Sequence, residues 1–275
     1  MKRIALIAKN AFRAVMSQRA VYLWGFAILI MFLVSGRALF TNARAPEVLA
    51  FIRATSVAAA LGVWSLMCLA AAVYLGATSV AGDLRSKTII TVLARPVRRW
   101  ELMLGKWIGV TAFCFVTLGI GVALGLALAA YVDVNVDRDG LAVAVMRTIG
   151  SIVVLGGIAT ALSASGSAPI AGAVAVLIGV MPMLITPLRE RPEPIYQRLG
   201  AALDMIIPPD NETLYGGVVW APVPASPAAA GAPAQRRTPI DAATQRQRTA
   251  EAIGYAGIYF AVGCFFFTRR DLKFS

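Results

Sequence analysis

Six long apolar runs limit what this chain can fold into more than any other feature of its sequence. The hydrocarbon core of a bilayer is about 30 Å thick, and a helix needs about 20 apolar residues to cross it. The mean hydropathy is +0.73, a value typical of membrane proteins. We therefore predict an all-α membrane protein with six transmembrane helices. The predicted spans are Val21–Phe40, Ser56–Val80, Trp107–Val132, Val145–Ala164, Ala168–Leu188 and Ala250–Thr268.

Prolines and glycines add detail to these spans. Pro182 and Pro187 predict that the fifth span is kinked or ends early, because proline removes a helix hydrogen bond. Two pairs of glycines have the spacing GxxxG, which permits close packing between helices of one chain or at a dimer face. These pairs are Gly105 with Gly109 and Gly121 with Gly125.

The first 19 residues have the pattern of an amphipathic helix. Apolar residues recur at intervals of three and four and share one face, and Lys2, Lys9 and Arg13 share another. A basic face over an apolar face suits the headgroup layer of an anionic leaflet, so we expect this helix to lie on the membrane surface. The apolar residues are Ile4, Ile7, Ala8, Ala11, Phe12 and Val15.

The distribution of Lys and Arg predicts the orientation. The N-terminal segment, the loop 81–106 and the C-terminal tail together carry fourteen basic residues, and the loops on the other side carry five. Short cytoplasmic loops are enriched in Lys and Arg, so both termini and the loop 81–106 are predicted to be cytoplasmic. The segment 189–249 is then extracytoplasmic. Its part 218–238 is rich in Pro and Ala, and we expect it to be extended or disordered.

The residue content argues against several kinds of chemistry. The net charge of +12 lies between the apolar runs rather than on one face, which favours a membrane protein over a nucleic-acid-binding one. The chain has no histidine, and its three cysteines all lie inside apolar runs without metal-ligand spacing. A Walker A motif is absent, since Gly105-Lys106 is followed by Trp107. We expect no metal site, no cofactor site and no catalytic residues.

The loop 81–106 is basic and also partly apolar. Span two can continue past Asp83 as a helix, and Pro96 forces a turn before a second helix that runs into span three. Trp100 and its apolar neighbours would form one face of that second helix, with Arg98 and Arg99 on the other. Arg and aromatic residues are favoured at protein interfaces, so this loop is a candidate docking surface for a soluble partner. An ordinary positive-inside loop would explain the charges but not the apolar faces.

The order of residues in this loop resembles that of type-2 ATP-binding-cassette (ABC) exporter permeases. The resemblance is carried by an acidic residue, a Ser-x-Thr-Ile step, an x-Pro-x-Arg step and a Leu-Gly-Lys step. Lys87 stands where that family usually has Gly, and Asp83 where it more often has Glu. The resemblance implies that the N-terminal helix is the family's elbow helix. It also implies that the loop couples the permease to a separate ATPase subunit. In this chain the pattern reads Asp83, Ser86–Ile89, Val92-Leu93, Arg95-Pro96, Arg98-Arg99 and Leu104–Lys106.

The resulting prediction is a single permease domain, residues 1–275, in a bacterial plasma or inner membrane. The expected partners are an ABC ATPase, which binds the ATP, a second permease subunit and membrane lipid, with no nucleic acid. An ATP-independent carrier or channel, and a non-transporting anchor or assembly factor, are the alternatives. The predicted partner-coupling residues are Asp83, Arg85, Thr88, Arg95, Pro96, Arg98, Arg99, Trp100 and Lys106.

Overall fold

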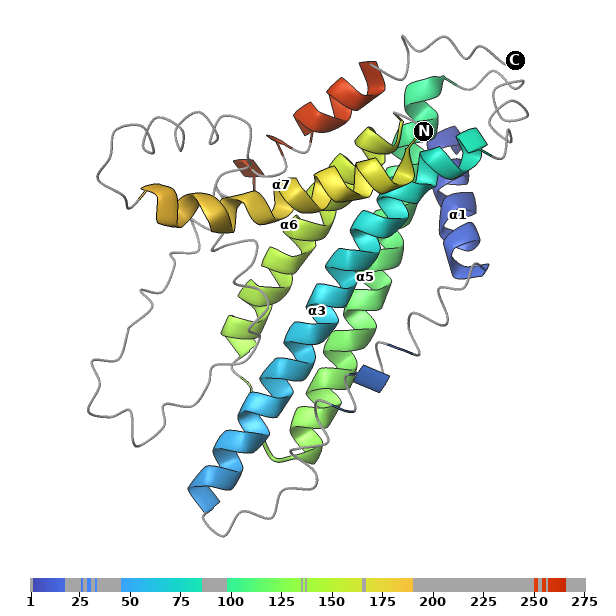
Figure 1. The fold of residues 1–275 in the computed structure, drawn as a ribbon. Coiled ribbons are helices and arrows are strands. Elements are labelled where there is room, and N and C mark those ends of the chain that lie inside the picture. The colour runs from blue at the N-terminus through green and yellow to red at the C-terminus, as the bar shows by residue number, and fades with distance from the viewer. Residues whose placement is uncertain are drawn as a thin grey trace.

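The regular elements in the described part of a computed structural model of the chain are all helices (Figure 1). The structure describes residues 2–17, 46–85, 98–134, 136, 138–164, 167–189, 250–251, 254–255 and 257–265, with 26, 29–30 and 33. The helices are α1 (Lys2–Ser17), α3 (Pro46–Arg85), α5 (Arg99–Tyr131), α6 (Arg138–Ser163) and α7 (Ala168–Arg189). Residues 257–265 are also helical.

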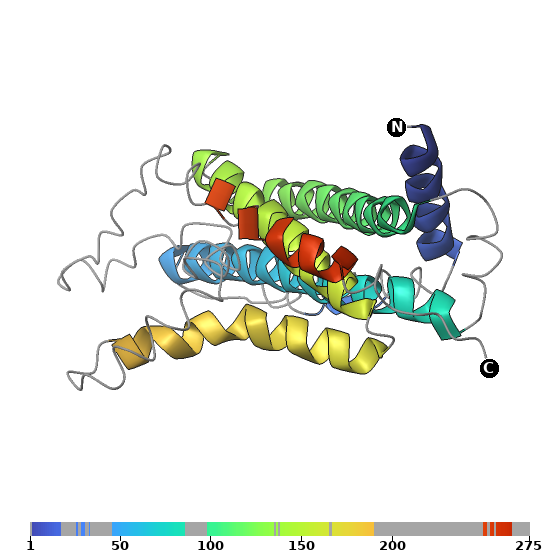
Figure 2. The same cartoon turned by 90° about the horizontal axis from the view of Figure 1, so that it is seen from above.

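Three long helices, α3, α5 and α6, lie side by side and form the body of the molecule (Figures 1 and 2). The chain runs in one direction along α3 and α6 and in the opposite direction along α5. Consequently the end of α3, the start of α5 and the end of α6 lie at the same end of the bundle. We call this the loop end, because the connection between α3 and α5 lies there. α7 starts near the loop end and crosses the other helices obliquely.

Glycines allow the three helices to pack closely. A Cβ atom added to Gly121 would lie only 1.8 Å from Nε1 of Trp64. The Trp64 indole is buried and donates a 3.0 Å hydrogen bond to the carbonyl of Thr117. One turn further, a Cβ on Gly125 would lie 2.0 Å from Leu61. The GxxxG pair Gly121/Gly125 is therefore a contact between α5 and α3 of one chain and not a dimer face.

The contact between α3 and α6 is built in the same way. A Cβ on Gly76 would lie 2.9 Å from the carbonyl oxygen of Gly156 and 3.0 Å from Ala159. Thr160 donates its hydroxyl hydrogen to the Gly156 carbonyl at 2.7 Å, so its polar group is satisfied within α6. Small residues with internally satisfied hydroxyls let two backbones approach without leaving a polar group exposed to lipid.

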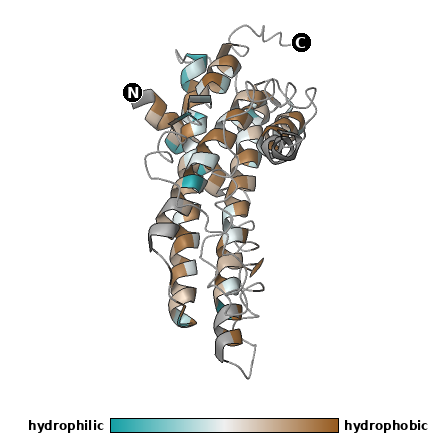
Figure 3. Ribbon diagram, turned by 90° about the vertical axis from the view of Figure 1, so that its left-hand side faces the viewer, coloured by the Kyte–Doolittle hydropathy of each residue, from teal (hydrophilic) through white to brown (hydrophobic). Residues whose placement is uncertain are grey.

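Three of the predicted spans are confirmed as helices long and apolar enough to cross a membrane. These are Ile52–Leu84, Arg99–Tyr131 and Ala144–Ser163, and Figure 3 shows hydrophobic colour over most of their length. α3 (Pro46–Arg85) extends beyond the predicted span at both ends, and α5 (Arg99–Tyr131) begins earlier than predicted, at the loop end. α7 (Ala168–Arg189) covers the fifth predicted span, and its segment Ala168–Gly179 is apolar.

The other predicted spans are described only in part. Only residues 26, 29–30 and 33 of the first are described, and 250–251, 254–255 and 257–265 of the sixth, all of them helical. The segment 190–249, with its part 218–238, lies outside the described residues. Six spans and the orientation in the membrane therefore stay predictions.

The fifth predicted span was expected to be kinked or to end early at its prolines. α7 continues through Pro182 and Pro187 to Arg189, so it does not end early, and the kink stays a prediction. Prolines are tolerated in membrane helices because neighbouring groups can satisfy the freed backbone carbonyl.

The N-terminal helix is confirmed, and its apolar face packs in part on α5. The six residues predicted to form that face are partly buried, and Lys9 and Arg13 are exposed. The apolar face packs on the first turns of α5, and the ring of Phe12 meets that of Phe113 edge-on, with centroids 6.2 Å apart. The face is thus partly covered by protein, and the position of the helix on the membrane surface stays a prediction. Figure 2 shows α1 running across the direction of α3 and α5.

Candidate coupling surface

The predicted coupling residues lie at the loop end, as far as the structure describes them. Arg85 is the last residue of α3, and α5 begins at Arg99. Residues 86–97 lie outside the described residues, and with them the predicted coupling residues Thr88, Arg95 and Pro96. Five predicted residues have described side chains, namely Asp83, Arg98, Arg99, Trp100 and Lys106.

The start of α5 presents Arg98 and Trp100 to the outside. Arg98 is extended, with φ −72° and ψ 141°, and caps the helix. Its backbone N–H donates a 3.1 Å hydrogen bond to the carboxylate of Glu101, which also places a negative charge at the positive end of the helix dipole. Arg98 is exposed, Trp100 is 40% exposed and Arg99 is half-buried. A basic and an aromatic side chain are therefore both exposed where the loop enters α5.

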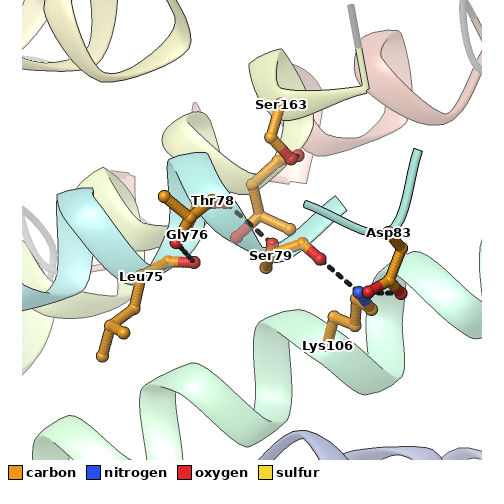
Figure 4. A network of polar contacts seen from close by, with 8 residues as sticks. Leu75, Gly76, Thr78, Ser79, Asp83, Lys106 and Ser163 are labelled. Atoms are coloured by element: carbon orange, nitrogen blue, oxygen red, sulfur yellow. Dashed lines mark hydrogen bonds and ion pairs between the residues drawn. The ribbon is translucent and has the colours of Figure 1, made fainter. Parts of the chain in front are cut away.

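Lys106 is not on this surface. Its ammonium group reaches from α5 to α3, where it pairs with the carboxylate of Asp83 and donates a hydrogen bond to the carbonyl of Ser79 (Figure 4). The Lys106 side chain is 12% exposed and that of Asp83 is 33% exposed. The ion pair thus joins the last turns of α3 to the second turn of α5. The sequence analysis named both residues but did not pair them. A signal was present, since they are opposite charges near the facing ends of spans two and three.

The position of Lys106 also bears on whether Gly105-Lys106 could bind nucleotide as a Walker A motif does. A Walker A lysine follows a glycine-rich loop whose free backbone N–H groups bind phosphate. Gly105 and Lys106 lie inside α5, where backbone N–H groups are used by the helix. The pair therefore does not have the structure of a nucleotide-binding loop.

Gly105 and Gly109 hold α1 against α5. A Cβ on Gly105 would lie 2.6 Å from the side chain of Ile7. One on Gly109 would lie 2.7 Å from both the Ala8 carbonyl and the Ala11 side chain. This second GxxxG pair also serves packing within the chain, so it is not a dimer face either.

Trp107 connects α5 to two further elements, a role that the sequence analysis missed. Its indole N–H donates a 3.2 Å hydrogen bond to the carbonyl of Val153 in α6. Its ring stacks on Phe260 of the helical residues 257–265, with ring centroids 4.9 Å apart and planes inclined at 27°. Nearby, Gly263 of the same segment packs on Ala161 of α6. The C-terminal helical segment therefore meets the bundle near the loop end.

The described part of the chain offers no group of three or more His, Cys, Asp or Glu residues placed to hold a metal ion. Its cysteines, Cys68, Cys114 and Cys264, are free thiols, and the first two are buried. The polar groups at the loop end are used for helix capping and for the ion pair between α3 and α5.

These helices define a multi-pass α-helical membrane protein in which an ion pair joins α3 and α5 at the loop end. A family model described as ABC-2 family transporter protein matches residues 5–191, which is most of the chain and includes α1, the loop end and α3 to α7. The chain therefore belongs to the ABC-2 family of transporter permeases, as the resemblance of its central loop implied. Among curated proteins, none matches it significantly.

Proposed function

We propose that this chain is the permease subunit of an ABC exporter and that a separate ATPase subunit binds at the loop end. ATP binding and hydrolysis by that subunit move the connection between α3 and α5. The movement reshapes a path for substrate between this permease and a second permease subunit. The complex works in a bacterial plasma or inner membrane, with both termini and the loop end in the cytoplasm. Family membership supports the permease assignment.

The observation that carries the proposal is that exposed residues at the start of α5 lie close to contacts that hold α5 against its neighbours. Arg98 and Trp100 project where the loop enters α5, and one to two turns below them α5 is held to three neighbouring elements. Arg and Trp are the residues that most often dominate binding at protein interfaces. A loop whose only role was to carry positive charge on the cytoplasmic side would not need these contacts between α5 and its neighbours.

The test is co-purification of an ATPase with the permease from mild detergent. We compare wild type with the charge reversal Arg98→Glu/Arg99→Glu, and measure ATP hydrolysis in the eluate. The matched control is Lys9→Glu/Arg13→Glu, which makes the same change in net charge at exposed positions of α1. Wild type and control are expected to retain an ATPase, and the loop-end variant to lose it. If the wild type retains none, the proposal is wrong. Equal losses from both variants would exclude a specific role for the loop end.

A further inference from the structure

Three consecutive residues of α5 contact four different parts of the molecule. Gly105 lies against Ile7 of α1, Lys106 pairs with Asp83 of α3, and Trp107 contacts α6 and the C-terminal helical segment. Successive residues of a helix point about 100° apart, because one turn takes 3.6 residues. One turn of α5 therefore contacts α1, α3, α6 and the C-terminal helical segment. We call Gly105, Lys106 and Trp107 the α5 junction.

The contacts of the junction are of three kinds, and all of them resist displacement. At Gly105 the backbone of α5 is in contact with α1, so sliding would bring atoms into collision. At Trp107 an indole hydrogen bond fixes the ring against the α6 backbone. Phe260 then stacks on the same ring and fixes the C-terminal helical segment.

The Lys106 contact is the one that joins the two helices leading into the loop. Ammonium groups are costly to bury in a membrane protein unless a partner compensates the lost hydration. Lys106 is nearly buried and has two partners on α3, the Asp83 carboxylate and the Ser79 carbonyl. Separating α3 from α5 would leave the buried ammonium without either partner. The pair therefore opposes any movement that opens the two helices at their loop end.

We propose that Lys106 is a positioning residue that makes the loop-end parts of α3 and α5 move as one rigid unit when the loop is displaced. Gly105 and Trp107 pass that movement to α1, α6 and the C-terminal helical segment. The displacement of the loop by an ATPase subunit rests on the proposed function. The rigidity of the unit formed by α3 and α5 is a property of this chain alone. Neither Lys106 nor Asp83 needs to touch the ATPase for this role.

The test measures the distance between α3 and α5 with two spin labels. One replaces Gly82 on α3, where a Cβ meets nothing within 4 Å, and the other replaces Ile108 on α5, which is exposed. The three native cysteines are changed to alanine in the labelling background. Distances are recorded on the full chain in lipid nanodiscs, alone and with its co-purified ATPase, without nucleotide and with ATP plus vanadate.

In the wild type we expect one narrow distance distribution that is the same in every state. Lys106→Met removes the charge and shortens the unbranched side chain by one heavy atom, so the distribution should broaden in the isolated chain and shift further with ATP and vanadate. Asp83→Asn should act in the same direction and serves as a second, milder variant. The matched control is Lys9→Met on the exposed face of α1, which should behave as wild type.

Two results would overturn the proposal. One is a Lys106→Met distribution as narrow and as constant as that of the wild type. The other is a wild-type distance that itself changes with nucleotide. A purely structural role would lower the thermal midpoint of the variant without making the distance depend on nucleotide. If no ATPase co-purifies, the proposed function fails. The measurements on the isolated chain still decide whether Lys106 holds the two helices together.

Discussion

The contact between Gly121 and Trp64 allows a sharp test of how α3 and α5 pack. In Gly121→Ala the new Cβ would lie 1.8 Å from Nε1 and 1.9 Å from Cδ1 of the indole, far inside van der Waals contact. The indole is fully enclosed and cannot simply move outward. Overpacking a filled core costs about 1–3 kcal/mol, and displacing the ring also endangers the Trp64–Thr117 hydrogen bond, worth about 1 kcal/mol. We expect Gly121→Ala to destabilise the chain by roughly 2–4 kcal/mol.

The control is Gly119→Ala on the same helix, where the added Cβ meets nothing within 4 Å. Both variants receive the same gain in helix propensity, so their difference isolates the clash. Thermal unfolding in one detergent, followed by size-exclusion chromatography, gives the midpoints. For a chain of this size 1 kcal/mol corresponds to about 2–4 °C, so Gly121→Ala should melt roughly 5–15 °C below Gly119→Ala. Equal midpoints would refute the packing described here.

Three further predictions concern the loop end. Ile7→Asp should detach α1 from α5 and raise its cleavage by added protease, whereas Leu6→Asp, at a neighbouring position that is 60% exposed, should leave cleavage unchanged. Trp107→Phe keeps a ring to stack but loses the indole hydrogen bond to α6. It should lower stability by about 1 kcal/mol in a thermal scan, and an unchanged midpoint would contradict the assigned bond. Asp83→Ala leaves the buried ammonium unpaired and should cost about 2–4 kcal/mol. Adding Lys106→Met should recover most of that loss, and a double variant no more stable than the single one would contradict the pairing.

The sequence predicted the helical elements well because hydrophobic periodicity and length are local properties. The amphipathic face of α1 was identified residue by residue, and three predicted spans are helices of membrane-crossing length. The sequence predicted less well which element packs against each face of a helix. The apolar face of α1 was expected against the membrane, and the sequence did not predict that two glycines about a hundred residues away pack against it. Periodicity reports that a face is apolar and does not report what covers it.

At the candidate site the sequence identified residue types but not pairings. Asp83 and Lys106 were both named as coupling residues, yet their ion pair depends on the register between α3 and α5. That register is set by distant contacts such as Trp64 with Gly121, which no local pattern encodes. Trp107 looked like one more apolar residue of its helix. Its contacts with α6 and the C-terminal segment follow only from the packing of the bundle.

The central claim is that an ATPase subunit binds at the loop end, and photo-crosslinking from the two ends of α5 tests it most directly. A photoreactive amino acid is placed at Trp100, which is 40% exposed at the loop end, or at Tyr131, which is 79% exposed at the opposite end of the helix. Both are exposed aromatic positions, so the two probes are matched in kind. After irradiation in native membranes, position 100 should yield a crosslinked product that contains an ATP-binding polypeptide, and position 131 should not. A crosslink to such a polypeptide from position 131, or from neither position, would contradict the account.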